Sequence, residues 1–342
     1  MKRVIEDQRG LLEKYVNKDV RRVPQVFIPY KEVLDIYNAG LQVPDDVTLM
    51  WCDDNYGYIR HFPTEEERLR KGGNGVYYHI SYWGRPHDYL WLATTSPALV
   101  YQQMKLAFDK GIQKMWILNV GDIKPAEYLI ELYMDMAWNL DAVADEGLDA
   151  HLCKFLKREF GGEIADSLLP VMKEYYRLAY IRKPEFMGNT REEDKSHYRI
   201  IKDLPWSESY ICERLNLYQE LSDRVEAIAG GIPERKQDTY FQLIKYPVQA
   251  SDQMNQKLLK AQLARHGKAD WKESDMAYDS IVALTRIYNN EKWNRIMDFR
   301  PRRLPVFERV KRGAVAEPMV AERKVLYKWN GAECNQGVPV IY

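Results

Sequence analysis

The chain has 342 residues, of which 46% are hydrophobic, so it is long enough to bury a substantial core in one or two domains. Its 50 basic and 50 acidic residues balance, and neither nucleic acid nor an anionic membrane is expected as a partner, because both require a concentrated basic face. No apolar run approaches the roughly 18 residues of a membrane span. The first residues alternate charged and apolar side chains, so no targeting signal is expected and the compartment stays open.

The cysteines and histidines give no pattern typical of a metal site. Four scattered cysteines, without a C-x-x-C pair, are expected to be buried thiols: Cys52, Cys153, Cys212 and Cys334. Four histidines in charged or helical surroundings are expected to be solvated: His61, His151, His197 and His266. Asp53-Asp54-Asn55 resembles the opening of a calcium loop but lacks the glycine and the distant glutamate at EF-hand spacing. We therefore expect no metal and no cofactor.

Short apolar runs alternate with helical segments over residues 1–140, which is typical of βα units and a parallel sheet. Strands are expected at 26–30, 47–52, 75–82 and 114–120. A helix is expected after each of them, at 32–39, 64–71, 97–110 and 125–140. The second of these helices begins with a Thr-x-x-Glu capping box at Thr64, glycines follow the first three, and the fourth has apolar residues at helical spacing.

From residue 141 the strand pattern is lost, and apolar residues recur every three or four positions, which indicates helices. The expected helices are 151–160, 164–180, 208–228, 238–265 and 272–288. Residues 141–299 are thus predicted to form an all-helical bundle. Residues 300–342, rich in proline, glycine and valine, are predicted to be a linker or tail leading toward a further domain.

Polar residues follow all four expected strands. Loops at the carboxyl ends of parallel strands converge on one concave mouth, so these side chains are expected to lie close together. They are Lys31 and Glu32, then Asp53, Asp54 and Asn55, then His79, Ser81 and Tyr82, then Asn119 and Asp122. For Asp54 and Asp122 a simple turn role remains an alternative, because aspartate often ends strands.

The residue types at these strand ends suit the cleavage of a glycosidic bond. That reaction needs one carboxyl group to protonate the leaving oxygen and another to activate water, and Glu32 and Asp53 are the candidates. Asn55, His79 and Tyr82 are predicted to donate hydrogen bonds to sugar hydroxyls or to a uronic carboxylate. The motifs of dinucleotide, P-loop, zinc-protease and α/β-hydrolase sites are absent from the sequence.

Donors and aromatic rings are dense in the segment from Tyr82 to Trp91. Arg85 is predicted to pair with a ligand carboxylate, and His87 either contacts a hydroxyl or holds a loop. Trp83, Asn119 and Asp122 complete the predicted substrate-binding set. Sugars stack on flat rings, although packing is the alternative for about half of the aromatics here: Trp51, Tyr56, Tyr58, Tyr77, Tyr78, Trp83, Tyr89 and Trp91.

At the same strand ends the sequence resembles glycoside hydrolase family 115, the xylan α-1,2-glucuronidases. Four segments of the first part carry the resemblance: Tyr30-Lys-Glu-Val33, Val43 to Gly57, Gly75 to Trp91, and Leu118 to Pro125. Three later segments extend it over nearly the whole chain: Arg182-Lys-Pro-Glu185, Tyr246-Pro-Val248 and Arg300-Pro-Arg-Arg-Leu-Pro305. The resemblance implies an α/β fold, the C-terminal half of a (β/α)8 TIM barrel followed by the helical bundle.

The resemblance also implies an activity. This is hydrolysis, with inversion and without a cofactor, of the α-1,2 bond joining glucuronic acid or its 4-O-methyl ether to xylose, with glucuronoxylan or its oligosaccharides as partner. Glu32 and Asp53 match the family's essential carboxylates, with acid and base roles open, Asn55 matches an essential amide, and His79 and Tyr82 match uronic-acid-binding residues. Family relatives are typically extracellular or periplasmic.

The family enzyme is longer, with an N-terminal domain, a full barrel and a C-terminal β-sandwich, and it places a required Asp and Arg on upstream strands. Nothing in this chain matches those two residues, so the chain is expected to be an incomplete fragment, and its activity on its own stays open. A half barrel has two open edges, which favours aggregation, a homodimer, or complementation by a missing half. A non-catalytic carbohydrate-binding remnant and a barrel enzyme of another specificity remain alternatives.

Overall fold

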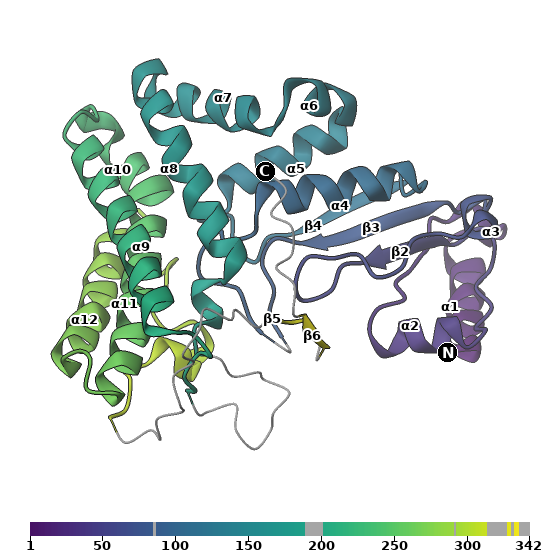
Figure 1. Ribbon diagram of the computed structural model, residues 1–342. Helices are drawn as coiled ribbons and strands as arrows, with labels where there is room; N and C mark the ends of the chain where they lie inside the picture. Colours follow the sequence, from purple (N-terminus) through teal and green to yellow (C-terminus); the bar gives the residue numbers. More distant parts are fainter. Residues whose placement is uncertain (85–86, 189–200, 291, 313–326, 330–331, 335–342) are drawn as a thin grey trace.

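The computed structural model describes residues 1–84, 87–188, 201–290 and 292–312, and the backbone of residues 327–329 and 332–334. A four-stranded parallel sheet lies at the centre of the first part, in the order β1-β2-β3-β4 (Figure 1). Its strands are β1 (Val26–Phe27), β2 (Thr48–Cys52), β3 (Asn74–His79) and β4 (Met115–Asn119).

A helix follows each strand, so the chain repeats the βα unit four times. These helices are α2 (Glu32–Asn38), α3 (Glu65–Arg68), α4 (Pro97–Asp109) and α5 (Glu127–Trp138). The predicted capping box is present, because Thr64 accepts from the amide of Glu67 and the Glu67 carboxylate accepts from the amide of Thr64. Sequential parallel strands with a helix after each one confirm the predicted half of a (β/α)8 barrel.

Two elements, β1 and α3, have half of their expected length or less, for local reasons. Strand β1 stops at Phe27 because Pro29 has no N–H with which to continue the ladder. Helix α3 stops at Arg68, and the chain then runs against the start of β2, where a Cβ on Gly72 would lie 2.3 Å from the carbonyl oxygen of Val47. Only glycine fits such a close approach of two backbones.

The two faces of the sheet differ in burial. Leu49, Trp51, Val76 and Tyr78 lie in the main hydrophobic core, which also contains residues of α4 and α5. Along the edge strand β4, Met115 and Ile117 alternate with core-packed neighbours and remain 39% and 37% exposed. The second face, the one that lines the interior of a closed barrel, is therefore partly open.

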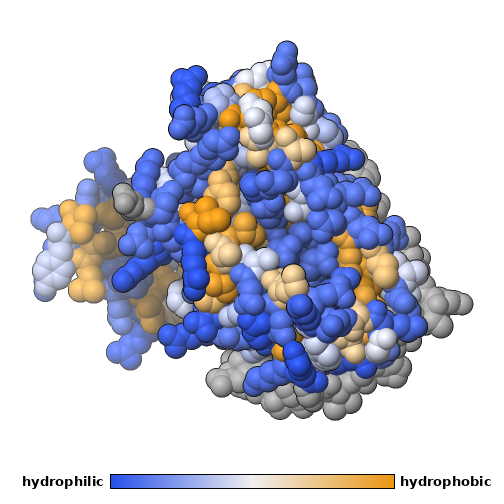
Figure 2. Space-filling view, turned by 90° about the vertical axis from the view of Figure 1, so that its left-hand side faces the viewer, coloured by the Kyte–Doolittle hydropathy of each residue, from blue (hydrophilic) through white to orange (hydrophobic). Residues whose placement is uncertain are grey.

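The rest of the described chain is mainly helical. Its helices are α6 (Leu140–Glu146), α7 (Leu148–Phe160), α8 (Gly162–Ile181), α9 (Glu208–Ala229), α10 (Gln237–Tyr240), a π-helical turn (Phe241–Lys245), α11 (Tyr246–Arg265) and α12 (Trp271–Tyr288). A second core lies among α9, α11 and α12, and polar side chains dominate the outer face of this part, with apolar patches between them (Figure 2). No helix within the described ranges is both long and apolar enough to cross a bilayer.

The start of the segment predicted to be a tail, residues 300–342, is packed against the helical part. Val306, Phe307 and Val310 are buried in the second core, and the Lys257 amine donates to the carbonyl oxygens of Val306 and Glu308. Farther along, β5 (Tyr327–Trp329) pairs antiparallel with β6 (Ala332–Cys334).

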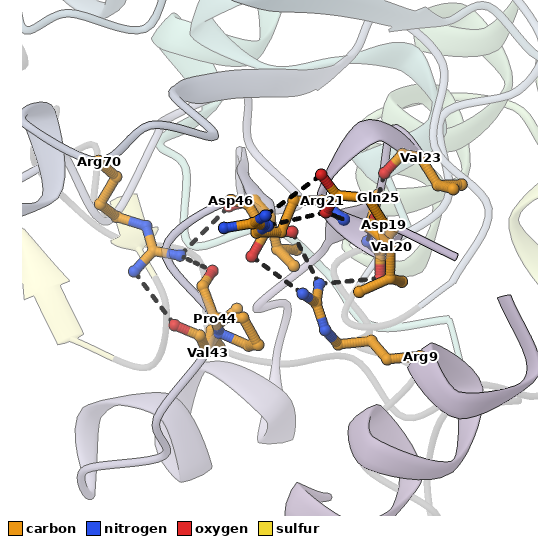
Figure 3. A network of polar contacts seen from close by, with 11 residues as sticks. Arg9, Asp19, Val20, Arg21, Val23, Gln25, Val43, Pro44, Asp46 and Arg70 are labelled. Carbon is orange, nitrogen blue, oxygen red and sulfur yellow. Dashed lines mark hydrogen bonds and ion pairs between the residues drawn. The ribbon is translucent and has the colours of Figure 1, made fainter. Parts of the chain in front are cut away.

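Helix α1 (Lys2–Tyr15) was not predicted, and it has no buried residue. It is held by polar contacts at the amino-terminal edge of the sheet (Figure 3). The Arg9 guanidinium donates to both oxygens of Asp46, at 2.9 and 3.1 Å, and to Gln25 at 3.2 Å. Ile5 is partly buried against the main core, so α1 combines a small apolar contact with these polar bonds.

Several expectations about histidine and cysteine were wrong. His151 is buried and bonds Asp135, and His61 is half-buried, with its ring stacked 4.1 Å from that of Trp51. His266 is also half-buried, and His197 lies outside the described residues. Cys52 and Cys153 are only partly buried and Cys212 is exposed, while the side chain of Cys334 is not among those described. A polar neighbourhood in sequence therefore did not mean exposure in the fold.

Candidate active site

A buried carboxylate–imidazole pair lies at the carboxyl ends of β2 and β3. Asp53 directly follows β2, His79 is the last residue of β3, and His79 Nδ1 lies 2.5 Å from Asp53 Oδ1. Burial raises the pKa of Asp53 to about 6, although the hydrogen bond to His79 opposes this shift. The other carboxylate oxygen, Oδ2, is buried without a hydrogen-bond partner in the described part of the chain. The Asp53 carboxyl group can thus gain or lose a proton near pH 6, and its Oδ2 has no hydrogen-bond partner among the described residues.

Tyrosines and a lysine surround this pair. The Tyr82 ring lies 4.9 Å from that of His79, and the Tyr30 and Tyr82 hydroxyls are in hydrogen-bond contact. Burial, followed by the bond to Tyr82, raises the pKa of Tyr30. The Lys31 ammonium lies 5.3 Å from the Tyr30 ring and 5.5 Å from the Tyr82 ring, as in cation–π contacts. The loops after three strands thus bring together acid, imidazole, phenol and ammonium groups.

Glu32 is placed differently from Asp53. It is the first residue of α2, it is exposed, and within the described residues it makes no side-chain hydrogen bond or ion pair. Lys31, just before it, has a φ of 50°, which is unusual for a residue with a long side chain. The two predicted catalytic carboxylates therefore lie after adjacent strands, one in water and one buried, without a contact between them.

Asn55 and His87 contact each other. The Asn55 amide donates to the His87 carbonyl oxygen at 2.5 Å and accepts from the His87 amide at 3.0 Å. The His87 ring packs 4.5 Å from the ring of Phe186. Asn55 therefore uses its amide to hold a loop, and the loop-holding alternative for His87 agrees with its position.

The remaining predicted residues are scattered. Asn119 donates to the Tyr77 hydroxyl at 2.7 Å, and Asp122 is exposed. Trp83 is 73% exposed, and Arg85 lies outside the described residues. Asp54 accepts from the amides of Tyr56 and Tyr58 and from Arg60, which is the turn role common for an aspartate at a strand end.

Two basic residues near this site were missed, Lys183 and Arg302. The Lys183 amine donates to the hydroxyls of Thr94 and Thr95, and Arg302 forms an ion pair with Asp88. Both lie in segments that resemble the family. Their contacts could not be predicted, because partners such as Arg302 and Asp88 are 214 positions apart and leave no local sequence signal. The described residues contain no cluster of three or more His, Cys, Asp or Glu side chains able to hold a metal.

Comparison with known proteins shows which family this chain resembles. The model of Glycosyl hydrolase family 115 matches residues 1–186, which is more than half of the chain. This chain belongs to glycosyl hydrolase family 115. A solved structure, the family GH115 4-O-methyl-α-glucuronidase BtGH115A "with specificity for decorated arabinogalactans", is 71% identical with a TM-score of 0.91. The match covers 96% of this chain and 44% of that one, so this chain spans less than half the length of its structural neighbour. No curated protein matches.

Proposed function

We propose that this family 115 chain carries part of the active site of an α-glucuronidase. The substrate is a polysaccharide decorated with glucuronic acid or its 4-O-methyl ether. The observation on which this depends is the buried Asp53–His79 pair, at 2.5 Å, beside Tyr82 and Lys31 at the carboxyl ends of parallel strands. Catalytic groups of (β/α)8 enzymes gather at that end of the barrel.

Asp53 and Glu32 are the carboxyl groups of the proposed acid–base reaction. A pKa of about 6 lets Asp53 exist in both protonation states near neutral pH, as an acid or base catalyst requires. Glu32, the first residue of α2, is open to solvent. Inversion is the outcome that the family resemblance implies, and in an inverting glycosidase one carboxyl group protonates the leaving oxygen while the other activates water.

The charge around the pair favours a uronic acid over a neutral sugar. Lys31 is a cation at the mouth, and the Tyr82 hydroxyl and the His79 imidazole add donors beside it. Ammonium and hydroxyl groups are suitable partners for a sugar carboxylate. We assign the uronic acid to these three side chains. The α-1,2 link to xylose is the bond that the resemblance implies, whereas the structural neighbour is specific for decorated arabinogalactans, so both polymers belong in the test.

The deciding assay measures uronic acid released from glucuronoxylan and from decorated arabinogalactan by a protein in which this chain completes the barrel, since the chain spans less than half of its structural neighbour. Asp53→Asn and Glu32→Gln are each expected to lower turnover by roughly 10²- to 10⁴-fold, because each removes a proton-transfer group. Asp145→Asn is the control, because Asp145 is an exposed carboxylate in α6, outside the predicted site, and its loss is expected to change nothing. Full turnover in both catalytic variants would remove the site assignment.

Calorimetry with free glucuronic acid separates catalysis from binding alone. Saturable binding without turnover on either polymer would favour the carbohydrate-binding alternative. Absence of both binding and turnover would reject the proposed function of this chain.

A further inference from the structure

A short loop beside the site holds an exposed tryptophan in a fixed place. We define the tryptophan loop as the described residues 82–84 and 87–89, which follow β3. Tyr82 and Tyr89 close it as an antiparallel bridge, with both N–H···O distances at 3.0 Å. Because Tyr82 also contacts His79, the loop continues directly from the candidate active site.

Asp88 ties this loop to a distant part of the chain. Its carboxylate accepts from the Gly84 amide across the loop and from the Arg302 guanidinium at 2.5 Å. The Asp88 side chain is only 3% exposed, whereas that of Arg302 is 29% exposed. A charge-assisted bond to an enclosed carboxylate is a strong constraint on loop position.

Arg302 also covers the indole. Its guanidinium carbon lies 5.3 Å from the centre of the Trp83 ring, yet Trp83 remains 73% exposed. One face of the ring is thus occupied by a cation, while much of the side chain is open to solvent beside the site. Flat exposed rings suit the apolar C–H faces of pyranoses, so the open surface is available for a sugar.

The backbone of the Arg302 segment has an unusual conformation. Arg302 and Arg303 have φ values of 54° and 52°, in the left-handed region that residues with a Cβ avoid. Beyond them Phe307 packs 5.5 Å from the Trp91 ring, and Lys257 holds the Val306 carbonyl oxygen at 2.6 Å. The segment is therefore fixed on both the loop and the helical part.

We propose that Arg302 is a positioning residue that holds Trp83 as a stacking platform for the sugars of the decorated polymer next to the uronic acid. This inference rests on the proposed function for the location of the uronic acid. The platform contacts the polymer chain, so it contributes to binding of oligosaccharides and not of free uronic acid.

The first test measures hydrogen exchange of the full chain. Arg302→Gln is expected to speed amide exchange in peptides covering the tryptophan loop at least tenfold. Arg303→Gln is the matched control, because Arg303 is adjacent, shares the unusual backbone and makes no side-chain hydrogen bond or ion pair within the described residues. Arg302→Lys, which retains the charge, is expected to restore part of the protection. Equal exchange in Arg302→Gln and Arg303→Gln overturns the positioning role.

The second test measures binding of a 4-O-methylglucuronic-acid-decorated xylo-oligosaccharide and of free 4-O-methylglucuronic acid. Trp83→Ala and Arg302→Gln are expected to weaken oligosaccharide binding about tenfold and to leave binding of the free acid unchanged. Trp83→Ala changes an exposed side chain, so this arm stays informative even if Arg302→Gln unfolds the chain. Equal loss for both ligands, or for neither, overturns the platform. If the unaltered chain binds neither ligand, the proposed function and the platform both fail, while the exchange test still decides whether Arg302 holds the loop.

Discussion

Burial of the Asp53 carboxyl group destabilises the folded chain at neutral pH, and it also gives this group the pKa that the proposed acid–base reaction requires. Its carboxyl group is fully enclosed, and burial raises its pKa to about 6 from an ordinary value of 3.8. The folded chain therefore binds the Asp53 proton more tightly than the unfolded chain does. Stability from this group is complete at low pH and is lost as the pH rises through about 4 to 6.

The first prediction follows from this loss of stability with rising pH. Asp53→Asn has no group to ionise, so the free energy of unfolding of the variant, relative to the unaltered chain, should increase between pH 4 and pH 7. A shift of about two pKa units corresponds to ~3 kcal/mol. Urea unfolding at several pH values measures the difference, with the exposed Asp122→Asn as control. If the difference in the free energy of unfolding between the variant and the unaltered chain does not change with pH, burial does not raise the pKa of Asp53.

Sequence reasoning found where these residues lie but not which way their side chains point. Alternating apolar runs and helices placed Asp53, Asn55 and His79 after neighbouring strands, because the order of βα units determines which loops meet. Whether an amide turns toward a ligand or toward a neighbouring loop depends on tertiary contacts. Asn55 bonds the backbone of His87, 32 positions away, and local pattern contains no information on that partner.

At the scale of elements, the close packing of β3 against its neighbours explains why a glycine stands at position 75. Gly75 in β3 lies opposite Met115 of β4, and a Cβ there would stand 2.7 Å from the Met115 carbonyl oxygen and 3.1 Å from the Met50 sulfur. Gly10 in α1 is exposed, and a Cβ added to it would meet no atom within 4 Å. The same substitution should therefore have opposite effects in the two elements.

The second prediction is that Gly75→Ala lowers the free energy of unfolding by about 1–3 kcal/mol, because the strands must shift to admit the methyl group. Gly10→Ala should raise it by up to ~1 kcal/mol through helix propensity. Thermal and urea unfolding of both variants measure the two signs. Destabilisation by both, to equal extents, would show that the strand contact is not the cause.

The helical part is joined to the barrel half by a charged connection. Lys183, just after α8, donates to the Thr94 and Thr95 hydroxyls at 3.1 Å and lies 4.8 Å from the Tyr89 ring. Burial lowers the pKa of Lys183 to about 8, and burial raises the pKa of the nearby Glu185, which accepts from the Leu92 amide at 3.3 Å. Each group partly offsets the pKa shift of the other, so Lys183 and Glu185 stabilise each other's charged form.

The third prediction concerns this connection. Lys183→Met should lower the free energy of unfolding by about 2–4 kcal/mol, because Glu185 loses its opposite charge in a buried place. Adding Glu185→Gln should recover part of the loss, which a double-mutant cycle measures by urea unfolding. Lys272→Met, on the exposed side of α12, is the control and should change little. Strictly additive effects would rule out coupling between Lys183 and Glu185.

The described part of the molecule has two hydrophobic cores and one partly open sheet face. The helical pattern anticipated the second core, because apolar residues at every third or fourth position form a face that must be buried. It did not anticipate α1 or the return of the Arg302 segment to the barrel half, since both depend on polar contacts between distant residues. The fold class thus followed from sequence, whereas the long-range polar contacts did not.

The last prediction is that copies of this chain associate through the edge of the sheet. Strand β4 has no neighbour on its outer side within the described sheet, and Ile117 on that strand is 37% exposed. An unpaired strand with exposed apolar side chains is a template for pairing. Sedimentation should show a mass that rises with protein concentration, and Ile117→Lys should suppress the rise by placing a charge on the edge. Leu69→Lys, at an 86% exposed site beyond α3, controls for added charge alone. If both variants associate like the unaltered chain, or if no association occurs, the edge is not an interface.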